Sequence, residues 1–123
     1  TQGIAVEVES FFVPEQSDPE ARSYFFGYKI RIANESTTQV QLVSRHWIIT
    51  DGLGRTEEVK GPGVVGQQPR LGPGESFEYE SFCPLMTPTG SMRGTYQMVE
   101  LGTQNKFDIE IPQFFLAEPN SYH

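Results

Sequence analysis

Alternation of apolar and polar residues with a period of two is the feature of this sequence that most limits its fold. Residues 3–10 place aliphatic side chains on one side and glutamates on the other. Comparable strand-like segments follow at residues 24–34, 39–50, 55–61, 76–82, 91–100 and 105–116. A period of two is typical of strands with one buried and one wet face. No segment has a 3.6-residue apolar period long enough to predict a helix.

The segments between these strands carry turn residues. DGLG at residues 51–54 separates two of the strand-like segments and predicts a hairpin, and residues 34–38 and LGPGE at 71–75 predict further turns. About seven strands without helices are typical of an antiparallel β-sandwich. We therefore expect an all-β fold.

Length and charge limit the organisation and the partners. The 123 residues suit one domain, 1–123, with an ordered part of about 3–117 and a tail, 118–123, that we expect to fray. Nine basic and sixteen acidic residues give a net charge of −7, which disfavours nucleic acid and anionic membranes as partners. No apolar run approaches the roughly 20 residues that cross a bilayer. A single cysteine excludes an internal disulfide, and we expect a cytoplasmic protein.

The stretch GPGVVGQQP contains the spacing of a dinucleotide-binding loop, in Gly61, Gly63 and Gly66. Such a loop must open a helix whose N-terminal amides hold the pyrophosphate. Here Pro and Gly residues at 69–74 prevent that helix, so a Rossmann unit is excluded. A Walker loop is excluded as well, because no Gly-Lys-Ser/Thr follows.

Two interpretations of the glycines remain. In the structural one, Gly61 and Gly63 bracket Pro62 in a turn, and Gly66 allows a bulge or a close backbone approach. In the functional one, the loop amides form a nest for an anion without any helix. A basic side chain would then complete the site, with Arg93 as the candidate and Arg55, Lys60 and Arg70 as alternatives.

The stretch SRHWIITDG is the most unusual local cluster. Alternation places Ser44 and His46 on one face and Arg45 and Trp47 on the other. Residues two apart on a strand are separated by roughly 6–7 Å, so Ser44 and His46 are not a ready-made catalytic pair. We expect Trp47 in the core and His46 hydrogen-bonded on its strand. Alternatively, Arg45, His46 and Asp51 form a surface for a ligand or partner.

The remaining chemistry-bearing residues favour structural roles. We expect Cys83 to be a small buried thiol rather than a nucleophile. The carboxylates of Glu57–Glu58, Glu78–Glu80 and Asp108–Glu110 are expected to form a solvated face rather than a glycosidase-type pair. One Cys and two His cannot build a Cys₂His₂ or Cys₄ zinc site, and no calcium-loop motif is present. We expect no catalytic residues, no metal site and no cofactor.

Residues 41–99, which include SRHWIITDGLG and GPGVVGQQP, closely resemble the ApaG family. The opening VEVESFFVPEQSDPE and the later FDIEIPQFFL are similar to it as well, so the resemblance runs from about Ile4 to Leu116. It implies a fibronectin type III-like or immunoglobulin-like sandwich without an established enzymatic activity. The family is associated genetically with diadenosine-tetraphosphate hydrolase genes and with cobalt and magnesium resistance or efflux. Its G-x-G-x-x-G pattern has been proposed to bind pyrophosphate. Related modules in eukaryotic F-box proteins and in a DNA-polymerase-delta-interacting protein imply protein interaction.

These observations leave three functional hypotheses. The first is a non-catalytic binding module for an unidentified protein partner. The second is a sensor of a phosphate-containing small ligand, such as pyrophosphate or a dinucleoside polyphosphate, on the Gly61–Gly66 loop with Arg93. The third is a metal-binding protein in which Co²⁺ contacts His46 or the carboxylate face. A role in cation resistance would be indirect in any of them, and a homodimer through an edge strand or the QFFL segment at 113–116 is compatible with each.

Overall fold

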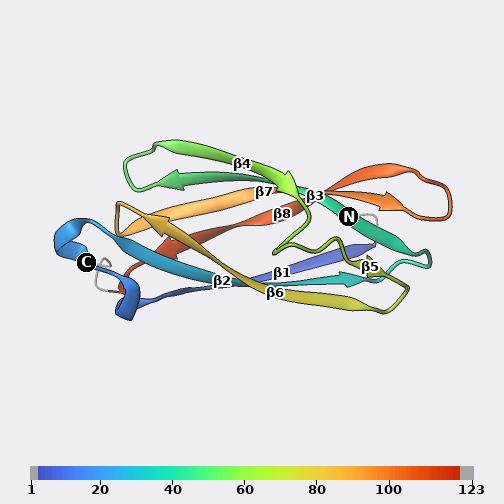
Figure 1. Ribbon diagram of the computed structural model, residues 1–123, viewed down its shortest axis with the longest axis horizontal. Coiled ribbons are helices and arrows are strands. Elements are labelled where there is room, and N and C mark those ends of the chain that lie inside the picture. Colours follow the sequence, from blue (N-terminus) through green and yellow to red (C-terminus); the bar gives the residue numbers. More distant parts are fainter. Residues whose placement is uncertain (1–2, 120–123) are drawn as a thin grey trace.

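Two antiparallel sheets pack face to face in the computed structural model, which describes residues 3–119 (Figure 1). The first sheet has the order β1-β2-β6, and the second has the order β4-β3-β7-β8 with β5 also paired to β3. The strands are β1 (Ile4–Phe12), β2 (Tyr24–Asn34), β3 (Val40–Asp51), β4 (Thr56–Pro62), β5 (Arg70–Leu71), β6 (Ser76–Leu85), β7 (Thr89–Glu100) and β8 (Lys106–Ala117). The all-β antiparallel sandwich predicted from the sequence is confirmed.

The strand-like segments of the sequence correspond to seven long strands. Within residues 3–119 the eighth strand is β5, whose two residues pair with the start of β3. The segment between β1 and β2 contains two single-turn 3₁₀ helices, Pro14–Gln16 and Pro19–Ala21, each with proline in its first turn. Proline fits that position because it has no N–H to leave unpaired.

The core lies between the two sheets and is centred on Trp47 of β3. The indole packs edge-on against Tyr28 of β2 at 5.6 Å, Tyr96 of β7 at 6.3 Å and Phe114 of β8 at 5.9 Å between ring centroids. Such edge-to-face contacts each contribute about 0.5–1.5 kcal/mol beyond the area that they bury. The prediction that Trp47 is the core aromatic residue is confirmed. Fully buried aliphatic side chains complete the core: Ile30, Ile32, Val40, Leu42, Ile109, Ile111 and Leu116.

The β3–β4 hairpin forms where DGLG predicted it. Asp51 N–H donates to Arg55 O at 2.9 Å, and Gly54 N–H donates to Asp51 O at 3.1 Å. Gly54 has φ +83°, a value that favours glycine. The hairpin makes β4 the outer strand of its sheet, because β4 pairs only with β3 in the described part of the chain.

The C-terminal strand passes close to the first one. Ser10 Oγ of β1 donates to Phe115 O of β8 at 2.9 Å. Within the QFFL segment, Phe114 packs against Trp47 whereas the Phe115 side chain is 70% exposed. After β8 ends at Ala117, Glu118 N–H still donates to Pro88 O at 2.8 Å. Residues 120–123 of the tail lie outside the described residues, so the fraying expected for 118–123 stays a prediction.

Candidate functional site

A β-bulge in β3 sets the orientation of the side chains in SRHWIITDG. Val40 and Leu42 are buried in the first half of the strand, whereas Trp47 is the buried residue in the second half. The register with β7 shifts between Leu42 and Ser44, so Val43 is the extra residue, and its side chain is 39% exposed. A bulge of this kind changes the parity of every residue after it.

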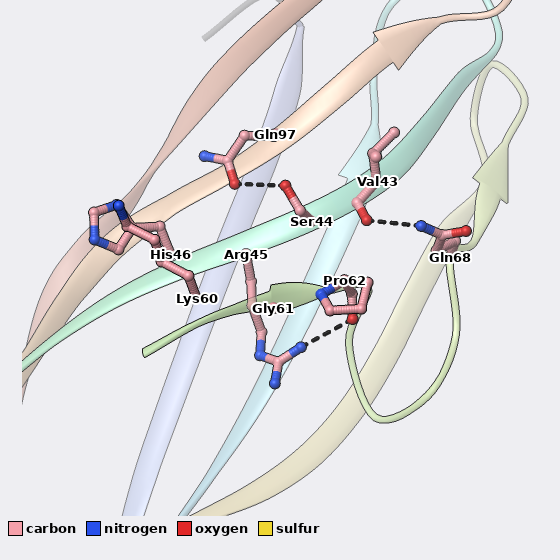
Figure 2. A pocket seen from close by; sticks show the side chains of 9 residues that line it. All are labelled: Val43, Ser44, Arg45, His46, Lys60, Gly61, Pro62, Gln68 and Gln97. Atoms are coloured by element: carbon pink, nitrogen blue, oxygen red, sulfur yellow. Dashed lines mark hydrogen bonds between the residues drawn. The ribbon is translucent and has the colours of Figure 1, made fainter. Parts of the chain in front are cut away.

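The outer face of β3 carries an open hollow of about 530 Å³ (Figure 2). Nine residues from β3, β4, the following loop and β7 line it: Val43, Ser44, Arg45, His46, Lys60, Gly61, Pro62, Gln68 and Gln97. Lys60 forms no salt bridge within residues 3–119. The hollow therefore offers an unpaired cation on a chain whose net charge is −7.

The polar side chains of this hollow bond to separate partners. Ser44 Oγ donates to Gln97 Oε1 at 2.8 Å, and His46 Nε2 lies 3.0 Å from Glu58 Oε1. A serine nucleophile needs its base within hydrogen-bond reach, and here the two groups point to different neighbours. The prediction that His46 is a hydrogen-bonded strand residue is confirmed.

Arg45 lies on the opposite face of β3 from His46 and points toward the loop after β4 (Figure 2). Its Nη1 donates to Pro62 O at 3.0 Å and to Gly63 O at 2.9 Å. An added Cβ at Gly61 would lie 3.1 Å from both Nη atoms. Gly61 thus leaves room for the guanidinium beside β4, and Arg45 is a basic side chain bonded to the glycine loop.

The other two glycines shape the loop itself. Gly63 has φ +60°, and a Cβ there would lie 2.2 Å from Gln67 O, which no side chain tolerates. Val65 and Gly66 have φ of 42° and 79° and occupy the two central positions of a tight turn from Val64 to Gln67. Positive φ at both central positions is the signature of a type I′ turn. The expected turn therefore lies at residues 64–67, while Gly61 and Pro62 belong to β4 rather than to a turn.

Two of the amides that the anion-nest hypothesis needs, those of Gly63 and Val64, are engaged within the fold. Gly63 N–H donates to Val43 O at 2.8 Å, and Val64 and Gln67 exchange N–H···O bonds of 2.8 and 2.9 Å. The side chain of Val64 is fully buried and anchors the loop to the core. Because these two amides point to fold partners, they are not available to an anion.

The remaining predicted residues are spread along the sheet. Arg93 of β7 pairs in register with Ile48, and it lines a separate hollow of about 380 Å³ with Glu110 and Gln113. Arg93 does not line the hollow of Figure 2, whereas His46 lines both hollows.

Asp51 is occupied by its own hairpin at the end of β3. Its carboxylate accepts N–H bonds from Leu53 and Arg55 and pairs with Arg55 Nε at 2.9 Å. Desolvation acts to raise the pKa of Asp51, but the backbone hydrogen bonds of Arg55 and Leu53, together with the Arg55 guanidinium, lower it below its ordinary value. Arg45, His46 and Asp51 therefore do not form one contiguous set.

A second concave region, which the sequence did not indicate, lies on the inner side of β3 where β4 faces β6. A hollow of about 330 Å³ is walled by aromatic and sulfur-containing side chains, among them Tyr28, Trp47, Cys83 and Met92. Burial, followed by the field of Glu57, raises the pKa of the Cys83 thiol to about 11, so the thiol is neutral at pH 7. The prediction that Cys83 is a buried thiol is confirmed.

Glu57 corrects the prediction that the strand carboxylates all face outward. It pairs in register with Ile49, two residues before Val59 pairs with Trp47, so its side chain shares the inner face of β4. Glu57 remains exposed because β4 is an edge strand. Glu58, one residue further, is on the outer face with His46.

Two further properties concern metals and membranes. Among residues 3–119, no three His, Cys, Asp or Glu side chains come together in a way that would hold a metal ion. The same residues include no helix of the length and apolarity that crossing a bilayer demands.

Comparisons with known proteins agree with the sequence resemblance. A family model described as the ApaG domain matches residues 14–100. Protein ApaG of Allorhizobium ampelinum is 52% identical over 98% of this chain and 92% of its own length, and Protein ApaG of Brucella anthropi is 55% identical over 97% and 91%. These names state no catalytic activity.

A crystal structure described as an ApaA protein from Bordetella pertussis is 52% identical, covers 96% of this chain and 95% of its own, and superposes with a TM-score of 0.92. An X-ray structure of a structural-genomics target is 43% identical over 98% and 91%, with a TM-score of 0.91. The chain therefore belongs to the ApaG family.

Proposed function

We propose that this chain is a non-catalytic binding module that docks a protein partner on the β3–β4 side of the sandwich. The observation that carries the proposal is the open hollow of about 530 Å³ beside the bulge, where apolar Val43 and unpaired Lys60 are both presented to solvent. The polar residues Ser44 and His46 beneath them bond to other side chains of the fold, which suits a fixed recognition surface. With its cysteine buried and reduced, the module is proposed to act in the cytoplasm.

The test compares partner capture by surface variants. Tagged wild-type protein and the variants Val43→Asp and Lys60→Glu are incubated with lysate under photo-crosslinking, and the retained proteins are quantified by mass spectrometry. A protein retained by the wild type and lost at least about tenfold in both variants supports the proposal, since a central contact contributes roughly 1.4 kcal/mol or more. Lys106→Glu, at the start of β8, makes the same charge change away from the hollow and serves as the control. Equal retention by all four proteins rejects the proposal.

A second candidate is the small-anion sensor. Lys60 favours it, because this cation has no salt-bridge partner in the described chain and lies beside Gly61 and His46 in the hollow. Pyrophosphate or diadenosine tetraphosphate would then contact Lys60 rather than consecutive loop amides. Titration followed by amide chemical shifts should perturb Ser44, Lys60 and Gly61 in a saturable way, and Lys60→Gln should abolish the change. Unchanged spectra at millimolar ligand reject this candidate.

In the main proposal, any link between this chain and Co²⁺ or Mg²⁺ resistance is indirect and comes from the partner protein. A protein that transports or regulates Co²⁺ or Mg²⁺ would be the docked molecule, and the module itself would bind no metal. Saturable perturbation of His46 by Co²⁺ at micromolar concentration would contradict this part of the proposal.

A further inference from the structure

The two long sides of the sandwich differ. On one side β1 and β8 approach each other, and Ser10 Oγ bonds to Phe115 O at 2.9 Å. On the other side β4 and β6 are both sheet edges: within residues 3–119, β4 pairs only with β3 and β6 only with β2. We call the space between β4 and β6 the seam groove.

The seam groove is elongated along the strands. The hollow of about 330 Å³ beside Trp47 adjoins another of about 190 Å³, and the two share Ile49, Glu57 and Pro84 as lining residues. Along β6 the lining runs from Ser81 to Leu85, a span of about 13 Å at 3.3 Å per residue, and Met86 continues it just beyond the strand. This is the length of an extended segment of five or six residues, whereas a compact ligand would leave one end of the groove empty.

The walls of the groove suit an apolar side chain. Trp47 and Met92 are buried at its floor, while Phe82 is 49% exposed and Met86 64% exposed along its rim. The free edge of β4 presents the N–H groups of alternate residues between Thr56 and Gly61, because the others bond to β3, whereas β6 lacks an N–H at Pro84. An extended chain that adds to a sheet edge obtains main-chain hydrogen bonds there and specificity from alternate side-chain pockets. β4 is therefore the edge to which a peptide would add.

Glu57 decides which occupant fits. Its carboxylate lies where the two hollows meet and forms no salt bridge in the described part of the chain. A second copy of the chain adding to the same edge of β4 would bring another Glu57 toward it, and like charges at a sheet edge oppose pairing. A basic side chain in the same place is attracted instead. The charge thus disfavours self-association and favours a basic segment of another protein.

We propose that the seam groove binds an extended, basic segment of a partner protein, with an apolar side chain entering between Trp47 and Met92 and a Lys or Arg two residues away, on the same face of the segment, paired with Glu57. This inference rests on the proposed function as a binding module, and it adds a contact on the inner side of β4 to the one proposed in the outer hollow. Arg45 closes one end of the groove, because its guanidinium is bonded to the carbonyl oxygens of Pro62 and Gly63.

The probe is a pair of end-blocked hexapeptides, Thr-Val-Lys-Leu-Val-Thr and its counterpart with Glu in place of Lys, added to the 123-residue chain. We expect the Lys peptide to bind at least tenfold more tightly by fluorescence polarisation and to shift the amides of Glu57, Val59 and Ser81. Glu57→Gln should weaken the Lys peptide about tenfold, and Glu57→Lys should reverse the preference between the two peptides. The control is Glu80→Gln, which removes an outward-facing carboxylate of β6 that pairs with Lys29 at 3.8 Å, and it should leave binding unchanged.

Three outcomes overturn the inference: equal affinity for the two peptides, shifts confined to the outer hollow, or a dimer of the wild-type chain that Glu57 variants alter. Analytical ultracentrifugation of each variant tests the last of these. Lysate capture separates the two proposals. A partner lost with Val43→Asp and Lys60→Glu but kept with Glu57→Lys overturns the groove and leaves the binding module standing. If the groove binds the Lys peptide and capture falls with Glu57→Lys but not with Val43→Asp or Lys60→Glu, the outer hollow is rejected as the docking site and the groove stands.

Discussion

The guanidinium of Arg45 lies against the Cα of Gly61, where a Cβ would come within 3.1 Å of both its Nη atoms. This contact explains the first glycine of the G-x-G-x-x-G pattern without any ligand. Arg45 in turn donates hydrogen bonds to Pro62 O and Gly63 O, so the arginine and the loop hold each other in place.

Gly61→Ala should therefore lower the free energy of unfolding by about 1 kcal/mol, because the displaced guanidinium loses hydrogen bonds to the loop. In an Arg45→Ala background the same substitution should be neutral or stabilising by up to about 1 kcal/mol, since alanine reduces the entropy of the unfolded chain. Urea unfolding of the four proteins measures both values. An equal cost of Gly61→Ala in both backgrounds would show that Arg45 is not the cause.

Val65→Asn should stabilise the protein by about 1 kcal/mol. Val65 is a β-branched residue with φ 42° in a type I′ turn, a conformation that asparagine adopts far more readily. Its side chain is 50% exposed, so the substitution leaves the core intact. The matched control is Gly66→Ala at φ 79°, which should cost about 1 kcal/mol although nothing lies within 4 Å of the added Cβ. Thermal unfolding should thus shift in opposite directions for the two variants.

The hydroxyl groups of Tyr79 and Tyr96 form a buried pair at 2.5 Å. Tyr96→Phe should destabilise the protein by about 1–3 kcal/mol, because the Tyr79 hydroxyl is left without its partner in the core. Replacing both tyrosines with phenylalanine should cost less than the sum of the two single substitutions. A double-mutant cycle from denaturant unfolding measures the coupling, and strict additivity would argue against an energetically important bond.

Alkaline pH should weaken the fold through Cys83. Burial and the field of Glu57 raise the pKa of this thiol from 9.0 to about 11, so the folded state favours the neutral form. Stability is retained below about pH 9 and is lost as the pH rises from there through about 11. Between pH 8 and 10 the wild type should lose about 1 kcal/mol more than Cys83→Ala. Parallel stability curves for the two proteins over this interval would contradict the prediction.

Burial also raises the pKa of Tyr28, and it raises those of Tyr79 and Tyr96 further. The contribution of these three tyrosines to the stability of the fold is likewise retained at pH values below the ordinary tyrosine pKa near 10. It is lost at higher pH, because the phenols of the unfolded chain ionise first. Tyrosinate absorbance should therefore appear for these three residues only as the protein unfolds, in step with the loss of near-ultraviolet circular dichroism. Full ionisation of all five tyrosines in the folded protein would be inconsistent with this burial.

Most of the fold follows from local patterns. Strict alternation in β1, β2 and β6 places Val6, Ile30 and Tyr79 on the inner faces, as the sequence predicts. DGLG specifies the hairpin that joins β3 to β4, because its glycines and aspartate suit a tight turn. The core position of Trp47 is predictable as well, because a large aromatic side chain on a long strand buries most apolar area when it points into the core.

The site was harder to predict because it depends on contacts between distant segments. No local signal connects Arg45 with Gly61, and none shows that β4 faces β6 across a groove. The sequence does contain a signal for the inner position of Glu57, because Glu57 has the same parity as Val59, the single aliphatic residue of β4. Arg93 was a reasonable charge for the glycine loop, but sheet order places it in a different hollow.

Val43 divides β3 into two halves that contribute opposite parities to the core. Deleting one residue between Leu42 and Ser44 would therefore do more than shorten the strand. It would force either the Leu42 half or the Trp47 half to turn its apolar side chains toward water. Deletions of one residue in the surface turns do not reverse which side chains of a strand face the core. Insertions and deletions in related chains should accordingly be found in those turns, while the residue count from Val40 to Trp47 is kept.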